Sequence, residues 1–137
     1  MSLVLDASMT MAWYFEDEAA PAAAALLDVV ASKGAVAPSL WRIEVANAFQ
    51  SAIRRKRIDE AYRNASLADL GRLPIVIDGD TNAHVWTTTL RLSDNHRLTI
   101  YDACYLELAQ RRILPLATLD RELGAAAALL GLPPLEV

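Results

Sequence analysis

Hydrophobic residues along the chain gather in short continuous runs, which are separated by longer segments with helical spacing. Four of the runs are typical of strands covered on both faces of a sheet: 2–5 ("SLVL"), 35–38 ("AVAP"), 73–77 ("LPIVI") and 114–118 ("LPLAT"). A further run at 134–137 ("PLEV") is a possible fifth strand. We therefore predict four or five strands, each of them short.

The segments between these runs carry helix signals. The first helix is expected to start near Asp17 or Glu18, to hold Pro21 in its first turn and to end at Gly34. Later helices are predicted at 40–57, 59–70, 81–92, 100–112 and 120–130, with a loop at 93–97 ("SDNHR"). Strands that alternate with helices predict an α/β fold with a mainly parallel sheet, formed by 1–137 as a single domain.

Four acidic residues lie where such a fold places its chemistry, because ligands bind beyond the carboxyl ends of parallel strands. Asp6 follows the first strand and Asp120 comes just after the fourth. Glu44 and Asp102 lie in the first turns of helices that can line the same edge. Four carboxylates in one cleft would repel one another unless a hard divalent cation, such as Mg²⁺ or Mn²⁺, lay among them.

Each acid also has a purely structural explanation, because a helix begins at or near every one of them. Asp6 and Asp120 can act as helix N-caps. Thr99 and Asp102 fit a capping box, and Glu44 can complement a helix dipole. These alternatives stay open for each residue alone, whereas the arrangement of all four together favours a metal site. We interpret 78–80 ("DGD") as a turn with an N-cap for the next helix.

Composition narrows the class of protein. Hydrophobic residues make up 54% of the chain, but no apolar run approaches the ~18 residues of a membrane span. No basic segment precedes the first apolar run, and Cys104 is the single cysteine, so we expect a cytoplasmic protein without internal disulfides. We interpret Cys104 as a small core residue rather than a nucleophile.

The charge pattern is ambiguous about nucleic acids. The formal net charge of −4 argues against a nucleic-acid binder, which is usually basic. The cluster 54–57 ("RRKR") nevertheless offers four adjacent cations. It can complement the dipole at the end of a helix or contact phosphates, and the sequence leaves both roles open.

Four motifs, "LVLDAS", "WRIEVANAF", "YDACYLELA" and "LATLDREL", resemble in this order those of PIN-domain ribonucleases, and in particular toxins of the VapBC toxin–antitoxin class. The resemblance covers the whole chain. It implies a three-layer α/β/α sandwich with a mainly parallel sheet of about five strands. It also implies endonucleolytic cleavage of RNA that depends on Mg²⁺ or Mn²⁺.

Carried over residue by residue, the resemblance assigns catalytic metal ligands and supporting polar residues. The ligands fall on Asp6, Glu44, Asp102 and Asp120, and the supporting positions on Thr118, Ser8 and Asn47. Cations around the cleft would hold the flanking phosphates, with Arg42, Arg54 and Arg55 as candidates.

The resemblance also implies partners: a cognate antitoxin, a homodimer and a larger toxin–antitoxin complex. An arginine of the antitoxin could pair with the acidic cleft and compete with the metal. Its apolar residues would need a groove, for which Trp13, Tyr14, Phe15 and Trp41 are candidates if they are not part of the core.

Two other functions are alternatives to a ribonuclease. The first is a PIN-like domain that binds a partner without catalysis, although the presence of all four acids argues against it. The second is an α/β signalling domain in which an aspartate accepts a phosphoryl group. That function needs a lysine near the end of the last strand, and the two lysines, Lys33 and Lys56, lie elsewhere.

Overall fold

The computed structural model describes residues 2–16 and 20–136. Its strands are β1 (Val4–Leu5), β2 (Ala35–Ala37), β3 (Ile75–Ile77) and β4 (Leu116–Ala117). Its helices are α1 (Ala7–Ala12), α2 (Pro21–Lys33), α3 (Trp41–Arg54), α4 (Glu60–Gly71), α5 (Thr81–His84), the π-helical turn η2 (Val85–Thr89), α6 (Leu90–His96), α7 (Ile100–Arg112) and α8 (Arg121–Leu129).

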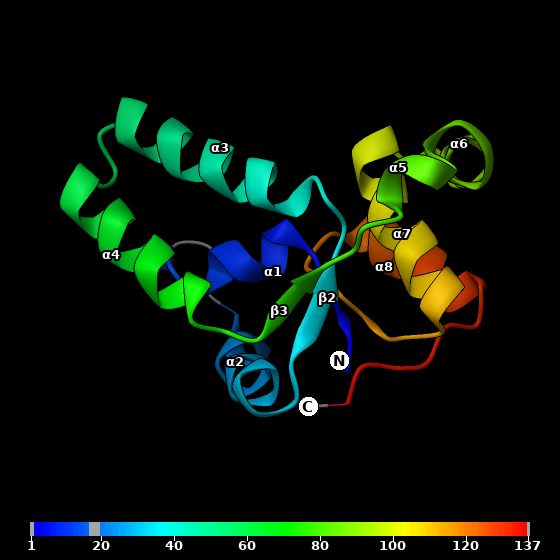
Figure 1. Cartoon of the computed structure of the whole chain (residues 1–137), viewed down its shortest axis with the longest axis horizontal. Coiled ribbons are helices and arrows are strands. Elements are labelled where there is room, and N and C mark those ends of the chain that lie inside the picture. The colour runs from blue at the N-terminus through cyan, green and yellow to red at the C-terminus, as the bar shows by residue number, and fades with distance from the viewer. Residues whose placement is uncertain (1, 17–19, 137) are drawn as a thin grey trace.

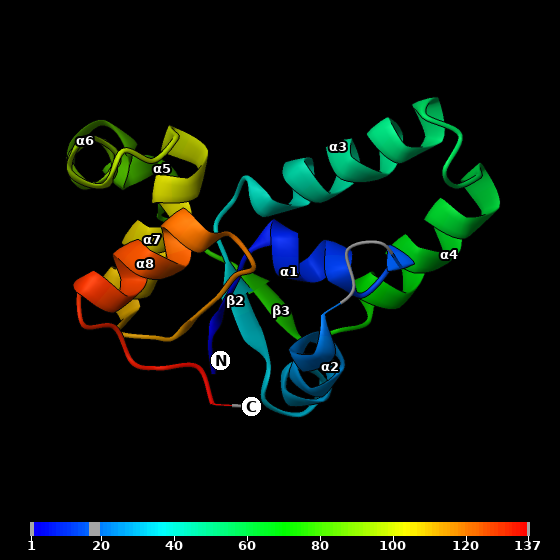
Figure 2. The same cartoon turned by 180° about the vertical axis from the view of Figure 1, so that it is seen from behind.

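The strands form one parallel sheet in the order β3-β2-β1-β4. Helices α1 to α4 lie to one side of it and α5 to α8 to the other, as Figures 1 and 2 show. Every residue of β1, β2 and β4 is buried, whereas β3 at the edge is partly exposed. The predicted α/β/α sandwich with a parallel sheet is therefore confirmed, with four strands in the described part of the chain rather than about five.

Two element predictions are wrong. Residues 134–136 form no strand, because Pro133 and Pro134 lack the N–H donors that a strand needs. Val137 lies outside the described residues. The predicted loop at 93–97 is mostly helical, because α6 continues to His96 and ends where Arg97 adopts a left-handed conformation with φ 54°.

Smaller differences concern helix ends and one helix interior. Helix α2 begins with Pro21 in its first turn, and the expected start at 17–18 lies outside the described residues. Helix α3 ends at Arg54 instead of residue 57. The predicted helix over 81–92 is interrupted by η2, a widened turn of the kind seen within longer helices.

The core lies between the sheet and the helices on both sides. Its largest fully buried side chains include Tyr105 of α7 and Phe49 of α3. Cys104 is buried, and burial raises the pKa of its thiol to about 11, so it is a protonated core residue as expected. No helix in the described ranges is long and apolar enough to cross a membrane.

Asp78, which follows β3 and precedes the turn at 79–80, anchors an ionic cluster. Its carboxylate is 1% exposed and accepts two hydrogen bonds from the Arg111 guanidinium, at 3.1 and 2.7 Å, and one of 3.1 Å from Arg112. The Thr81 hydroxyl donates to the same carboxylate at 2.9 Å, and Arg111 also pairs with the buried Glu107. Residues 79–80 form the predicted turn and Asp80 occupies the N-cap position of α5, but its side chain makes no capping hydrogen bond.

The cluster sets the ionisation of Asp78. Burial alone would raise the pKa of its carboxyl, but hydrogen bonds from Arg111, Thr81 and Arg112 outweigh burial, and the pKa falls well below its usual range. The charged carboxylate therefore ties the end of β3 to the last turn of α7.

We predict that Asp78→Ala lowers the free energy of unfolding by about 3 kcal/mol, because it removes a buried carboxylate that pairs with two arginines. Denaturant titration at pH 7 measures this loss. Asp69→Ala is the matched control: it breaks the exposed pair with Arg72 and should cost less than about 1 kcal/mol.

The contribution of Asp78 should also depend on pH. Since its pKa is lowered in the folded state, the stabilisation is present above the ordinary carboxyl pKa of about 4 and is lost as the pH falls further. Equal losses of stability in the two variants at pH 7 would contradict this account.

Candidate active site

The candidate site lies where β1 and β4 end side by side. Leu5 is in register with Ala117, and the N–H of Asp6 donates to the carbonyl of Ala117 at 3.0 Å. This pairing places Asp6 beside Thr118 at one edge of the sheet. Helix α7, which carries Asp102 in its first turn, packs against both strands.

Asp6 is held by two hydroxyl groups. Its side chain is 4% exposed, and its Oδ2 accepts hydrogen bonds from Ser8 at 2.7 Å and from Thr118 at 2.6 Å. The Ser8 oxygen accepts from the N–H of Leu119, and the Thr118 oxygen accepts from the N–H of Asp120, both at 3.0 Å. Asp6 therefore fixes the loop after β4, and its side chain makes no capping bond to α1.

The capping explanations hold for two other residues. Asp120 caps α8, because its Oδ1 accepts a hydrogen bond of 3.0 Å from the N–H of Leu123. Thr99 caps α7, because its hydroxyl accepts from the N–H of Asp102 at 3.1 Å. The cap of α7 is thus made by Thr99, and the cap of α8 uses only one oxygen of Asp120.

Glu44 has a partner that the sequence analysis did not identify. In the first turn of α3, its Oε1 accepts a hydrogen bond of 2.6 Å from the hydroxyl of Tyr105. Tyr105 is fully buried and lies three residues after Asp102 on α7, hence on the same side of that helix. A hydroxyl on the buried side of a helix, one turn from a candidate acid, is the signal that could have revealed it.

The four acids form one electrostatic group. Burial raises the pKa of Asp6, although hydrogen bonds from Thr118 and Ser8 oppose it, and the charge of Asp120 adds to the increase. Burial also raises the pKa of Glu44 and of Asp102. The charge of Asp6 adds to both increases, that of Asp102 to the pKa of Glu44, and that of Asp120 to the pKa of Asp102. The structure thus brings the four carboxyls close enough to repel one another.

The other sequence candidates are less closely tied to this group. Ser8 and Thr118 contact Asp6 directly, whereas Asn47 is exposed on α3 and its side chain makes no hydrogen bond to a described residue. Arg42 is exposed in the first turn of α3. Arg54 and Arg55 are exposed at its far end, about 15 Å along the helix from Glu44.

The chemistry of this donor set fits a hard divalent cation. All four side chains offer carboxylate oxygens, and no ion pair within 2–16 and 20–136 neutralises any of them. Over the same ranges, no three acidic, histidine or cysteine side chains are gathered tightly enough to hold a metal ion as they stand. The residues therefore match such a cation in kind and charge.

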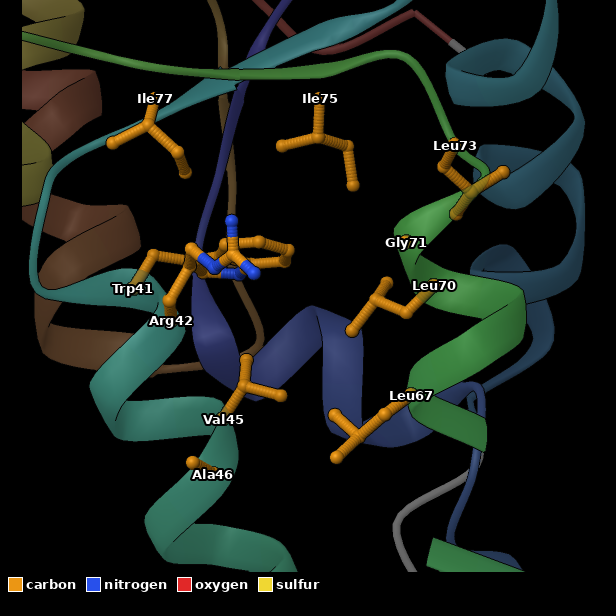
Figure 3. Close-up of a pocket in the computed structure, with 10 residues that line it drawn as sticks. All are labelled: Trp41, Arg42, Val45, Ala46, Leu67, Leu70, Gly71, Leu73, Ile75 and Ile77. Carbon is orange, nitrogen blue, oxygen red and sulfur yellow. The ribbon is translucent and has the colours of Figure 1, made fainter. Parts of the chain in front are cut away.

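An apolar groove of about 400 Å³ opens beside α3. As Figure 3 shows, side chains of α3, α4 and the segment around β3 face one another across it: Trp41, Arg42, Val45, Ala46, Leu67, Leu70, Gly71, Leu73, Ile75 and Ile77. Of the aromatic candidates only Trp41 lines this groove, and it is itself 5% exposed. Phe15 is buried and Trp13 and Tyr14 are half-buried against the core, so the expected exposed aromatic surface is largely absent from these residues.

Comparison with known proteins gives consistent matches. The family model of the PIN domain matches residues 3–129. Ribonuclease VapC1 of Mycobacterium tuberculosis (strain CDC 1551 / Oshkosh) is 34% identical over 131 residues, which cover 82% of this chain and 93% of that protein. Ribonuclease VapC3 of Pyrobaculum aerophilum is 30% identical over 124 residues, covering 90% and 93%. The crystal structure of PAE2754 from Pyrobaculum aerophilum superposes with a TM-score of 0.68 at 26% identity, covering 92% of this chain and 84% of that one.

We predict that Asp102→Asn stabilises the fold by about 1 kcal/mol at pH 7.5 and low salt, because it removes one of the mutually repelling charges. Solvent screens part of this effect, since Asp102 is only partly buried. The raised pKa means that the repulsion develops as the pH rises above about 4, so the gain should shrink toward pH 4.

Thermal unfolding at the two pH values measures this gain. Asp94→Asn is the control, because Asp94 is exposed on α6 and lies outside the acidic group. A loss of stability in Asp102→Asn at pH 7.5 would show that Asp102 stabilises α7 by more than its repulsion of the other acids destabilises the fold.

Proposed function

The chain belongs to the PIN-domain family, and from this premise we propose that it is an endoribonuclease that hydrolyses RNA phosphodiester bonds with Mg²⁺ or Mn²⁺. We further propose that it acts in the cytoplasm as the toxin of a toxin–antitoxin pair. The observation that carries the proposal is the group of four acids that follow β1 and β4 or lie in the first turns of α3 and α7. Relatives named as VapC ribonucleases support it.

In this proposal Asp6, Glu44, Asp102 and Asp120 hold the cation. A bound divalent cation would activate water for attack and neutralise charge at the phosphate. Ser8 and Thr118 hold Asp6 in place and favour its ionised form against the effect of burial, because each donates its hydroxyl proton to Oδ2. Glu44, Asp102 and Asp120 are all less buried than Asp6, so each of them is better placed than Asp6 to accept a proton from the attacking water.

Cations along α3 would position the RNA. Arg42 is exposed in the same turn of α3 as Glu44, but it lies on the other side of the helix and lines the groove beside α4, so its guanidinium would reach a phosphate only where the RNA passes that side. Arg54 and Arg55 would contact phosphates farther along the strand, since they lie about 15 Å away. These contacts offset locally the net charge of −4.

We predict that Asp102→Asn lowers the rate of RNA cleavage at least ~100-fold while the fold is retained, because metal-assisted catalysis supplies several kcal/mol to the transition state. The rate is measured on a labelled RNA with Mg²⁺ or Mn²⁺, with a chelator-treated sample as the reference for lost metal. Asp94→Asn should cleave like the wild type.

A purely structural role for Asp102 makes the opposite prediction, namely intact cleavage with a stability loss of about 1 kcal/mol. Cleavage by the wild type that survives the chelator would exclude the metal. A wild type without any cleavage would favour a PIN-like domain that only binds a partner.

The proposed antitoxin would silence the enzyme at two places. An arginine inserted among the four acids would pair with their carboxylates and compete with the cation. The apolar residues of the same segment would occupy the groove between α3 and α4, whose walls are mostly aliphatic (Figure 3). We also expect two copies of the chain to associate within the complex.

We predict that co-expression with the product of the neighbouring gene yields a stable complex with suppressed RNA cleavage, and that Ala46→Glu weakens the complex at least tenfold. Ala46 is exposed and lines the groove, so a charge there meets apolar side chains of the partner. Ala65→Glu is the matched control, because Ala65 is exposed on α4 and does not line the groove.

Size-exclusion chromatography with light scattering and a binding titration provide the measurements. A chain that stays monomeric, binds no co-expressed protein and is harmless to growing cells when induced alone would contradict the toxin–antitoxin role.

A further inference from the structure

The hydrogen bond between Tyr105 and Glu44 extends the site beyond its four acids. We propose that Tyr105 is a positioning residue, which orients the Glu44 carboxylate for the divalent cation. This inference rests on the proposed function, since it deepens the account of the same metal site. In this proposal Tyr105 acts through Glu44 and does not itself contact the RNA or the reacting atoms.

The geometry shows why the hydroxyl can fix the carboxylate. The distance of 2.6 Å from the Tyr105 oxygen to Oε1 of Glu44 is in the range of hydrogen bonds to an ionised carboxylate. The Tyr105 side chain is fully buried in the core, so its hydroxyl has little freedom to move. Glu44 is half-buried and would otherwise rotate about three bonds.

The direction of the hydrogen bond leaves one oxygen for a ligand. The hydroxyl has a single proton and the bond engages Oε1, whereas Oε2 accepts no hydrogen bond from a described residue and is therefore the more open oxygen for a cation. A tyrosine hydroxyl is protonated at neutral pH, so Tyr105 is the donor in this bond. Partners of this kind are found behind metal ligands, where their loss typically weakens metal binding 10- to 100-fold.

The position of Tyr105 also couples two ligands through one helix. Asp102 and Tyr105 lie one turn apart on α7, whereas Glu44 belongs to α3. Helix α7 therefore supplies one acid itself and orients a second on a different helix. The relative placement of the two acids thus depends on the hydrogen bond between Tyr105 and Glu44, which joins the two helices.

The test is the affinity for Mn²⁺, measured by calorimetry on wild type, Tyr105→Phe, Glu44→Ala and the double variant. Tyr105→Phe keeps the buried ring and removes only the hydroxyl. We expect it to weaken Mn²⁺ binding about tenfold. In the Glu44→Ala background the same substitution should have no further effect, because the group through which it acts is gone.

Tyr101→Phe is the matched control, since it removes a hydroxyl from the same helix at a side chain that is 60% exposed. It should bind Mn²⁺ like the wild type. RNA cleavage by Tyr105→Phe should be reduced at limiting Mn²⁺ and recover when Mn²⁺ is raised, which general damage to the core would not allow. Thermal unfolding of each variant reports on the fold.

The outcomes separate the inference from the function on which it rests. If the wild type and Tyr105→Phe bind Mn²⁺ equally well, Tyr105 is only a core residue and the metal site stands. The same holds if Tyr105→Phe lowers the affinity for Mn²⁺ by the same factor in the wild-type and Glu44→Ala backgrounds. If the wild type binds no Mn²⁺, or Glu44→Ala binds it undiminished, the role of Glu44 as a ligand fails and the inference falls with it.

Discussion

The parallel pairing of β1 with β4 is the constraint on which the candidate site depends. It is only two residues long, yet it sets Asp6 and Thr118 side by side at the edge of the sheet. The hydroxyls of Ser8 and Thr118 then bind the Asp6 carboxylate and receive the backbone N–H groups of the loop after β4. A buried carboxylate that accepts two hydroxyl donors thus determines where the loop carrying Asp120 leads. The first turns of α3 and α7 add Glu44 and Asp102 to this fixed frame.

Two strand-end aspartates at the same edge of the sheet differ in how their charge is compensated. Asp78 is paired with two arginines, and its pKa is lowered. Asp6 is equally buried but is surrounded by other acids and neutral hydroxyls, and its pKa is raised. A buried acid whose charge is left uncompensated costs stability, and such costs are concentrated at functional sites. The contrast supports a functional role for Asp6 and its neighbouring acids and a structural role for Asp78.

Much of the fold could be predicted from the sequence, because strands buried on both faces leave continuous apolar runs and helices leave periodic ones. The placement of Asp6 and Asp120 at strand ends followed from the same reasoning. Long-range partners could not be predicted. Arg111 lies 33 residues from Asp78, and Tyr105 lies 61 residues from Glu44, so no local pattern reveals either bond. The prediction of a fifth strand at 134–137 was wrong for a local reason, since an apolar composition does not supply the backbone N–H donors that a strand requires.

Helix α7 links the ionic cluster around Asp78 to the proposed site, because its two ends are tied to different parts of the fold. Near its start, Asp102 joins the acidic group and Tyr105 holds Glu44. Its last turn is fixed to the end of β3 through Arg111 and Asp78. A helix anchored at both ends cannot shift along its axis without breaking the ion pairs at one end or the hydrogen bond at the other. The ionic cluster therefore does more than stabilise the fold: by fixing α7, it also limits how far Asp102 and Glu44 can move apart under their mutual repulsion.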